Sequence, residues 1–337
     1  CIDRAVDARQ PFFACLSFNA PHTPLHVSKD LVDKYHGKFS AGWDVLRQQR
    51  VERLKKIGLI DDRYRLIPPG PEVRRWSELP ERTRTHEAFR MATYAAVIDR
   101  LDQNVGRLLQ HLEKRKIAGN TLVIFLSDNG GDYGNGNIAT DRQQRPWDPK
   151  SVPNMANGWA SLKCAPFQHY KTSAFEGGLR VPCIMRWPAG LKHPPDTILH
   201  HQAHVTDLYP TFLALAGATY DAKPTNRAPL HGKSLVPLLR DPALPLEATS
   251  HPTFWAFEAT SRGYLDYPWK VVSVNNGPWQ LYKLDDDPAE SVNLATTHPE
   301  RLKRLANQWQ SFAENDTPMP PSWRLPVRPE QQGWGFH

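Results

Sequence analysis

The sequence predicts an α/β protein with a mostly parallel sheet flanked by helices, followed by a small C-terminal antiparallel sheet with a helix. Three observations support this. A long amphipathic helix leads through a turn into a β-branched strand, a second apolar strand follows later, and short aromatic runs begin after about residue 245. We therefore predict a main α/β domain over residues 1–245 and a small α+β subdomain with a tail over residues 246–337.

The long helix is predicted over Thr85–Arg115, and Gly119-Asn120 then forms a turn before the strand Thr121–Leu126. Apolar side chains recur in the helix every three or four residues and so share one face. They are Tyr94, Ile98, Leu101, Val105, Leu108 and Leu112. A helix, a turn and a buried strand in this order form half of a βαβ unit, which favours a parallel sheet.

The other predicted elements come from apolar runs between turn residues. In the main domain they are a buried strand at Pro11–Phe18, a basic helix at Ala41–Gly58, a proline-rich surface segment at Ile67–Pro80, a strand at Val181–Trp187 and a helix at His204–Gly217. In the C-terminal part they are strands at Phe254–Phe257, Trp269–Val274 and Trp279–Leu284, a helix at Pro299–Glu314 and a loop from Asp316.

Composition excludes several classes of protein. Hydrophobic residues make up 40% and charged residues 23%, as in ordinary globular proteins. The net charge of +7 comes with no zinc finger, RNP-type motif or basic helix with interleaved aromatics, so we expect no nucleic-acid partner. No apolar run is long enough for a membrane span. The four cysteines show no paired metal spacing.

Two adjacent residues, Asp128 and Asn129, follow a predicted strand directly. Ligands of open parallel sheets bind at the carboxyl ends of strands, and carboxylate and amide oxygens suit Ca²⁺ or Mg²⁺. The alternative is an Asx-turn that leaves the strand.

His22 and Lys171 are the other candidates. His22 lies between two prolines in a loop, where an imidazole can form hydrogen bonds or transfer a proton near neutral pH. Lys171 precedes Glu176-Gly177-Gly178 by five residues, and an ammonium group can hold a tetrahedral oxyanion. The alternatives are a surface histidine and a solvated lysine. We also consider Trp147 and Trp159 as rings that can stack on a substrate.

The combination of these segments in this order resembles the sulfatase family of the alkaline-phosphatase-like superfamily. The matching segments are P-F-F-x-x-L-S-F-N-A-P-H-T-P (Pro11–Pro24), S-D-N-G-G (Ser127–Gly131), Y-K-T-S-A-F-E-G-G-L-R-V-P (Tyr170–Pro182), W-P-A-G (Trp187–Gly190), H-V-T-D-L-Y-P-T (His204–Thr211) and the stretch Trp279–Ala295. Two further segments, Ala41–Arg50 and Asp99–Leu109, look like the bacterial arylsulfatase branch.

The resemblance implies hydrolysis of aryl or alkyl sulfate esters. In the family, a Cys or Ser in C/S-x-P-x-R is oxidised to formylglycine, whose hydrate attacks sulfur, while Ca²⁺ holds the nucleophile and sulfate oxygens. Paired N-terminal aspartates and the Asp and Asn of D-N-G bind this Ca²⁺, and the latter correspond to Asp128 and Asn129. His22 and Lys171 are implied to contact the sulfate or its bridging oxygen, as catalytic and substrate-binding residues.

This sequence lacks the paired aspartates, the C/S-x-P-x-R motif and the Lys/His pair that follows it, and we expect them upstream of Cys1. Cys164-Ala165-Pro166-Phe167-Gln168 matches C-x-P-x but ends in Gln, and Ser151–Met155 fails at the same position. We therefore expect weak metal binding, an inactive chain on its own, an incomplete sheet and poor solubility.

Two alternatives remain open at this stage: a phosphomonoester or phosphonate hydrolase of the same superfamily, and a non-catalytic anion-binding protein derived from a sulfatase. The expected partners are a small-molecule or glycan sulfate ester and, for the full-length parent, a formylglycine-generating enzyme or maturase. Residues Cys1–Gln10 do not form a signal peptide, and both the periplasm and the cytoplasm of a bacterium fit the sequence.

Overall fold

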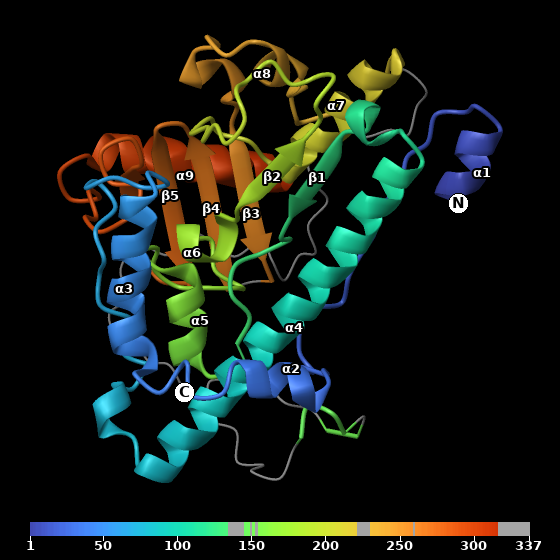
Figure 1. The fold of residues 1–337 in the computed structure, drawn as a ribbon. Helices are drawn as coiled ribbons and strands as arrows, with labels where there is room; N and C mark the ends of the chain where they lie inside the picture. Colours follow the sequence, from blue (N-terminus) through green and yellow to red (C-terminus); the bar gives the residue numbers. More distant parts are fainter. Residues whose placement is uncertain (134–144, 149, 152–153, 221–229, 259, 316–337) are drawn as a thin grey trace. The chain divides into compact units, whose positions relative to one another are not determined.

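A computed structural model describes residues 1–133, 145–148, 150–151, 154–220, 230–258 and 260–315 (Figure 1). The chain divides into two compact units. The first unit comprises residues 1–50, 69–163 and 182–189, and the second comprises residues 51–68, 164–181 and 190–337. Each unit is described by itself below. The boundary that we predict at residue 245 stays a prediction.

The first unit is built around one long helix, α4 (Glu81–Lys114), which confirms the helix predicted from the apolar spacing. Its other elements are α1 (Ile2–Asp7), α2 (Lys29–Lys34), the beginning of α3 (Gly42–Lys56), the short helices η1 (Trp76–Glu78) and η2 (Ala118–Asn120), and α5 (Asn157–Cys164). Helix α2 lies beside α4 (Figure 1), where Leu31 and Val32 pack against Ala96. The helix predicted at Ala41–Gly58 is confirmed as α3.

Three tryptophans form the centre of the first unit's core. The ring of Trp43 lies edge-on at 4.8 Å from Trp76 and at 5.2 Å from Trp159, measured between centroids. Trp76 belongs to the segment that we predict as a surface excursion, and that prediction is wrong at this residue because the indole is only 7% exposed. Trp159 is completely buried, so it is not available for stacking on a substrate.

Strands β1 (Val123–Leu126) and β2 (Cys183–Arg186) confirm two predicted strands, but they pair antiparallel. The mostly parallel sheet is therefore not confirmed: the described part of the first unit contains this antiparallel pair alone. Nor is β1 fully buried. Phe125 and Ile184 are directly opposite each other and are 41% and 63% exposed, because no further described strand or helix covers that face.

The strand predicted at Pro11–Phe18 is absent from the structure. The segment has no regular secondary structure, and Phe13 is 72% exposed. A strand needs a neighbour to satisfy its backbone hydrogen bonds, and no described strand pairs with this segment. Its apolar sequence therefore does not suffice to form one.

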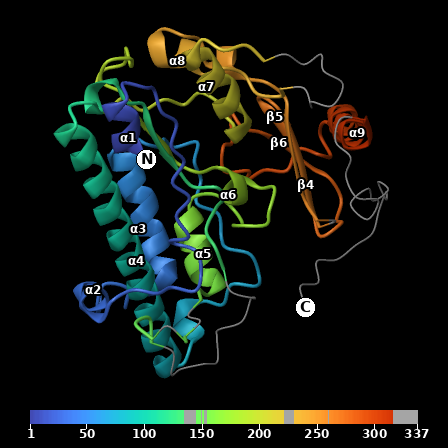
Figure 2. The same ribbon diagram turned by 90° about the vertical axis from the view of Figure 1, so that its right-hand side faces the viewer.

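The second unit confirms the predicted antiparallel sheet and adds one strand to it. The order is β3 (Thr253–Phe257), β4 (Ser261–Asp266), β5 (Trp269–Val274) and β6 (Gln280–Lys283), each antiparallel to its neighbour. Strand β4 (SRGYLD) was not predicted because its polar residues and glycine hide its apolar pattern. Helix α9 (Pro299–Asn315) covers one face of this sheet (Figures 1 and 2), with Leu305 and Trp309 packed against Val271 and Leu281.

Short helices complete the second unit. They are α6 (Glu176–Leu179), η3 (Val205–Asp207), α7 (Leu208–Ala216), α8 (Val236–Arg240) and η4 (Leu246–Thr249). Helix α7 ends at Gly217, which adopts the left-handed conformation (φ 65°) that a glycine allows at a helix C-terminus. The tail predicted as a loop from Asp316 lies outside the described residues. None of the helices that the structure describes is long and apolar enough to cross a membrane.

Candidate active site

His22 lies in a tight turn of the first unit. Its backbone N–H donates to the carbonyl of Asn19 at 2.9 Å, and its imidazole Nδ1 lies 2.6 Å from the carbonyl oxygen of Thr23. A carbonyl oxygen only accepts, so Nδ1 carries the proton in this contact. In the neutral imidazole Nε2 is then the basic atom. The His22 side chain is 51% exposed.

Asp132 connects the His22 turn to the S-D-N-G-G segment. The Thr23 hydroxyl donates to Asp132 Oδ2 at 3.3 Å, and Nε2 of His22 lies 3.9 Å from the same oxygen. Lys163 of α5 donates to the Asp132 backbone carbonyl at 2.8 Å. The sequence reasoning missed Asp132; the available signal was its place directly after Gly131 in the run D-N-G-G-D.

Asp128 and Asn129 lie in the turn that follows β1, where Asp128 is exposed and Asn129 is half-buried. The Ser127 hydroxyl donates to the Asn129 carbonyl at 3.0 Å. Gly131 sits against α5: a Cβ added there would be 3.0 Å from the Ala160 carbonyl oxygen. The strand end and the close approach to α5 together fix the position of this turn.

The donor atoms of Asp128 and Asn129 are hard oxygens that suit Ca²⁺, but their number is too small for it. Ca²⁺ takes roughly six to eight oxygen ligands. The described residues contain no group of three or more His, Cys, Asp or Glu side chains that could hold a metal ion. Within the described ranges, Asp128 and Asn129 therefore make up at most part of a Ca²⁺ site.

Lys171 belongs to the second unit and is half-buried. It lies in a turn in which the Ser173 N–H donates to the Tyr170 carbonyl at 3.3 Å. Thr172 in the same turn adopts a φ of 74°, a conformation that is uncommon for a residue other than glycine. His22 and Asp132 are thus brought together in the first unit, whereas Lys171 is placed within the second.

The E-G-G motif after Lys171 is fixed by buried charges. The Lys270 ammonium of β5 lies 2.6 Å from Glu176 Oε1 and 2.9 Å from Glu290 Oε1, and all three side chains are buried. Burial would raise the pKa of Glu176, but attraction to Lys270 and Arg180 lowers it. Burial raises the pKa of Glu290 to about 7, against the attraction of Lys270. The sequence reasoning did not find Lys270 or Glu290, because nothing local distinguishes them.

The two glycines of this motif allow close backbone packing. A Cβ at Gly177 would lie 2.2 Å from the Gln168 carbonyl oxygen, and one at Gly178 would lie 2.1 Å from that of Ser173. Any side chain would therefore push the turn apart. The motif holds the residue 168–178 segment in a compact turn with Lys171 in it.

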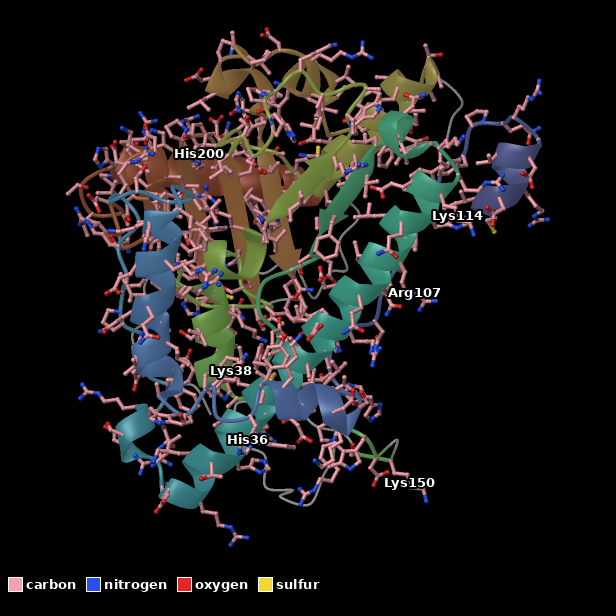
Figure 3. The ribbon with its side chains drawn as sticks, viewed as in Figure 1. His36, Lys38, Arg107, Lys114, Lys150 and His200 are labelled. Carbon is pink, nitrogen blue, oxygen red and sulfur yellow. The ribbon has the colours of Figure 1, made fainter. Side chains whose placement is uncertain are left out.

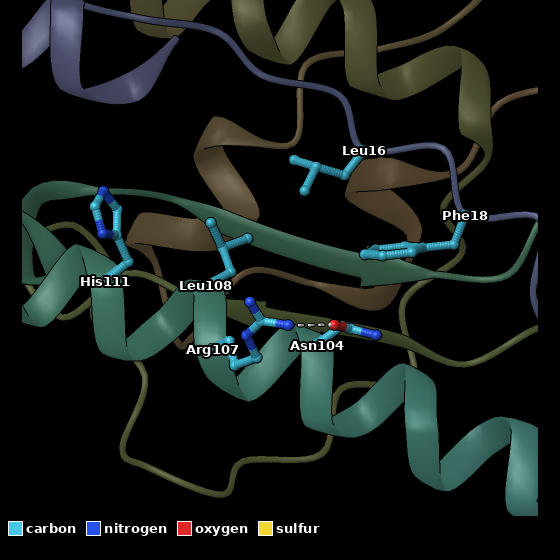
Figure 4. A pocket seen from close by; sticks show the side chains of 6 residues that line it. All are labelled: Leu16, Phe18, Asn104, Arg107, Leu108 and His111. Carbon is cyan, nitrogen blue, oxygen red and sulfur yellow. Dashed lines mark hydrogen bonds between the residues drawn. The ribbon is translucent and has the colours of Figure 1, made fainter. Parts of the chain in front are cut away.

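A shallow pocket lies elsewhere in the first unit and contains none of the candidate residues. It has a volume of about 430 Å³. It lies between the segment with Leu16 and Phe18 and four residues of α4, as Figure 4 shows. The four residues are Asn104, Arg107, Leu108 and His111. Arg107 donates to Asn104 at 3.3 Å. We assign no catalytic role to this pocket.

Basic side chains are spread over several segments. Figure 3 labels Arg107 and Lys114 on α4, His36 and Lys38 after α2, Lys150, and His200 in the second unit. All six are exposed. Arg107 and Lys114 belong to one helix, and the other four come from separate segments.

Comparison with known families identifies the class of protein. The family model described as Sulfatase matches residues 2–218. This chain belongs to the sulfatase family, as the residue patterns predicted.

Among curated relatives, an uncharacterized sulfatase of Schizosaccharomyces pombe is 32% identical over 89% of this chain and 57% of its own length. An arylsulfatase of Klebsiella aerogenes is 30% identical over 64% of this chain and 48% of its own length. The chain thus spans about half the length of these relatives.

Solved structures agree on the fold. The crystal structure of Ps i-CgsB covers 96% of this chain with a TM-score of 0.59 and 23% identity, and 54% of that chain is matched. The crystal structure of a putative sulfatase, yidJ, from Bacteroides fragilis covers 93% of this chain with a TM-score of 0.54 and 20% identity, and 56% of that chain is matched. The same Ps i-CgsB has been solved in complex with k-i-k-neocarrahexaose.

Proposed function

We propose that the protein to which this chain belongs is a sulfuric ester hydrolase of the arylsulfatase type. The observation that carries the proposal is the contact of the His22–Thr23 turn with Asp132, which brings the P-H-T-P segment to the end of the D-N-G-G-D run. Family membership supplies the chemical class. The geometry adds that two segments separated by 109 residues meet within one unit.

His22 is proposed to act through Nε2, because Nδ1 is engaged with the Thr23 carbonyl. An imidazole held in this way can donate a proton from Nε2 when charged or accept one when neutral. The role that fits a sulfate ester is to protonate the bridging oxygen as the alcohol leaves. Lys171 is proposed to bind the sulfate oxygens as a cationic point charge.

The proposed cofactor is Ca²⁺, with Asp128 and Asn129 as two of its ligands. The remaining ligands and the formylglycine nucleophile are proposed to lie outside this sequence, and a formylglycine-generating enzyme or maturase would be the partner that forms the nucleophile. Cys164 does not take that place: it is a buried thiol at the C-terminus of α5, and Gln168 stands where the motif needs an arginine.

The proposed substrate is an aryl or alkyl sulfate ester, either a small molecule or a sulfated glycan. The curated arylsulfatase relative supports the first, and the oligosaccharide complex of Ps i-CgsB supports the second. Neither relative specifies the alcohol part for this chain.

The decisive experiment is to clone the reading frame around this sequence, co-express it with a formylglycine-generating enzyme and assay aryl sulfate hydrolysis. We expect turnover of the sulfate ester, a C/S-x-P-x-R motif upstream, and a loss of kcat on His22→Ala. The matched control is His36→Ala, which changes an exposed histidine of the same unit. Absence of the motif, or faster hydrolysis of a phosphonate monoester than of the sulfate ester, would overturn the proposal.

A further inference from the structure

The Glu176–Lys270–Glu290 network is a fully buried group of charges to which the proposed reaction assigns no part. Buried charge pairs pay a large desolvation penalty and are weak evidence for stability. Lys270 is 0% exposed, Glu290 1% and Glu176 7%. The network is better explained by what it holds in place than by its contribution to folding.

What it holds is the segment of residues 168–178 that contains Lys171. Oε2 of Glu290 accepts the backbone N–H of Glu176 at 2.7 Å, and the backbone carbonyl of Glu290 accepts from Gln168 Nε2 at 2.6 Å. The Gly177 N–H closes the segment by donating to the Gln168 carbonyl at 3.1 Å. Glu290 therefore contacts both ends of the segment.

A third attachment comes from the sheet. The backbone N–H of Ala174 donates to Oγ of Ser261 in β4 at 2.7 Å. Lys270 lies in the adjacent strand β5, opposite Leu265 of β4. Two neighbouring strands of an antiparallel sheet thus anchor the segment, and a sheet with continuous backbone hydrogen bonds is a rigid support.

We propose that Lys270 and Glu290 are positioning residues, which fix the 168–178 segment so that the Lys171 ammonium is presented to a tetrahedral oxyanion. The inference rests on the proposed function, in which Lys171 contacts the sulfate group. Neither residue touches the substrate. Lys270 acts through Glu176, and Glu290 acts through the Glu176 N–H and Gln168.

The chemistry of Glu290 suggests how to test this. The Glu290 side chain accepts a hydrogen bond from the Glu176 N–H. A glutamine has nearly the same shape, and its side-chain carbonyl oxygen can also accept that hydrogen bond. The raised pKa of Glu290, caused first by burial, indicates that the site tolerates the uncharged form. Alanine removes the acceptor and leaves the Glu176 N–H buried without a partner.

The experiment uses this chain with Glu290→Ala and Glu290→Gln, read by amide hydrogen exchange and by NMR titration with inorganic sulfate. For Glu290→Ala we expect exchange at the Glu176 and Gly177 amides to rise by about tenfold or more relative to the β4–β5 amides. The dissociation constant for sulfate should rise by a similar factor. Glu290→Gln should restore both values to near those of the unchanged chain.

The control for general destabilisation is Leu305→Ala, which creates a cavity in the core between α9 and the sheet. It should raise exchange across the whole second unit and leave the ratio of segment to sheet exchange unchanged. If Glu290→Ala does not fold, Ser261→Ala releases the same segment at Ala174 and should raise exchange there first. If amide exchange in Glu290→Ala rises uniformly across the second unit, as expected for Leu305→Ala, the inference is overturned.

Lys171→Ala separates this inference from the proposed function. If Lys171→Ala weakens sulfate binding and Glu290→Ala does not, the positioning role is wrong and the role of Lys171 stands. If Lys171→Ala leaves sulfate binding unchanged, the proposed role of Lys171 is wrong, and the inference that depends on it is overturned as well.

Discussion

The imidazole Nε2 of His251 lies 2.7 Å from Oδ1 of Asp207, and both side chains are buried in the second unit. The same Asp207 carboxylate accepts the backbone N–H groups of His204 at 2.7 Å and Lys233 at 2.8 Å. Asp207 therefore joins the start of η3, the Lys233 segment and His251, which lies two residues before β3. The hydrogen bond to Asp207 raises the pKa of His251 above its ordinary value of 6.5, against the effect of burial.

This pair predicts a pH dependence of stability. A raised pKa means that the folded protein holds the His251 proton more tightly than the unfolded chain does. The contribution to stability is thus complete below pH 6.5 and is lost as the pH rises through the raised pKa. We expect the Tm of the second unit to fall over that window, and His251→Gln to flatten the fall. His298→Gln changes an exposed histidine of the same unit, and this variant should show the same fall in Tm as the unchanged chain.

Glu290 adds a second pH dependence of stability, which begins at a lower pH than that of His251. Its pKa is raised from 4.5 to about 7, so its contribution is complete below pH 4.5 and is lost as the pH rises to about 7. In Glu290→Gln we expect the fall in Tm between these values to shrink, while the fall caused by His251 persists. Identical pH profiles for the unchanged chain and Glu290→Gln would contradict this assignment.

Packing at Gly158 predicts a stability difference between two glycines of the first unit. A Cβ at Gly158 would lie 2.3 Å from the Trp43 ring, whereas one at Gly106 meets nothing within 4 Å. Gly158→Ala should destabilise the unit by about 1–3 kcal/mol through overpacking. Gly106→Ala, within α4, should stabilise it by about 0.5–1 kcal/mol. Urea unfolding followed by tryptophan fluorescence measures the free energy of unfolding of each variant. Equal changes in the two variants would contradict the prediction, because they would show that the tryptophan cluster accommodates the added methyl group.

The exposed pair Phe125 and Ile184 predicts self-association of this chain. These side chains lie opposite each other on one face of β1–β2 and are 41% and 63% exposed. Exposed apolar side chains on a short open sheet favour pairing between molecules. Changing both to threonine should shift the chain toward monomer in sedimentation analysis. Ile57→Thr, at an equally apolar but separate exposed site, should leave the distribution unchanged.

The incomplete ligand set predicts weak Ca²⁺ binding. With Asp128 and Asn129 as the proposed ligands, we expect calorimetry on this chain to give a Ca²⁺ dissociation constant above about 1 mM. Asp128→Ala should abolish what binding remains. Micromolar affinity that survives Asp128→Ala would place the site elsewhere.

Local patterns in the sequence predicted most helices and several strands. The apolar spacing from Tyr94 to Leu112 requires a helix, and α4 confirms it. Gly217 marks the end of α7 because glycine adopts a positive φ without strain. The Pro11–Phe18 strand failed because an apolar run becomes a strand only beside a partner, and the partner is not a local property. The antiparallel pairing of β1 with β2 was hidden for the same reason.

For the candidate site, too, local sequence patterns and contacts between distant residues determine different features. The sequence by itself determined the family, through His22, the D-N-G-G run and the E-G-G block, because these motifs are short and contiguous. Only the tertiary structure placed Asp132 beside His22 and joined Glu176 to Lys270 and Glu290. These contacts join residues 94 to 114 positions apart in the chain. Hydrogen bonds and buried charges act over a few ångströms, so folding alone determines which distant residues come within their reach.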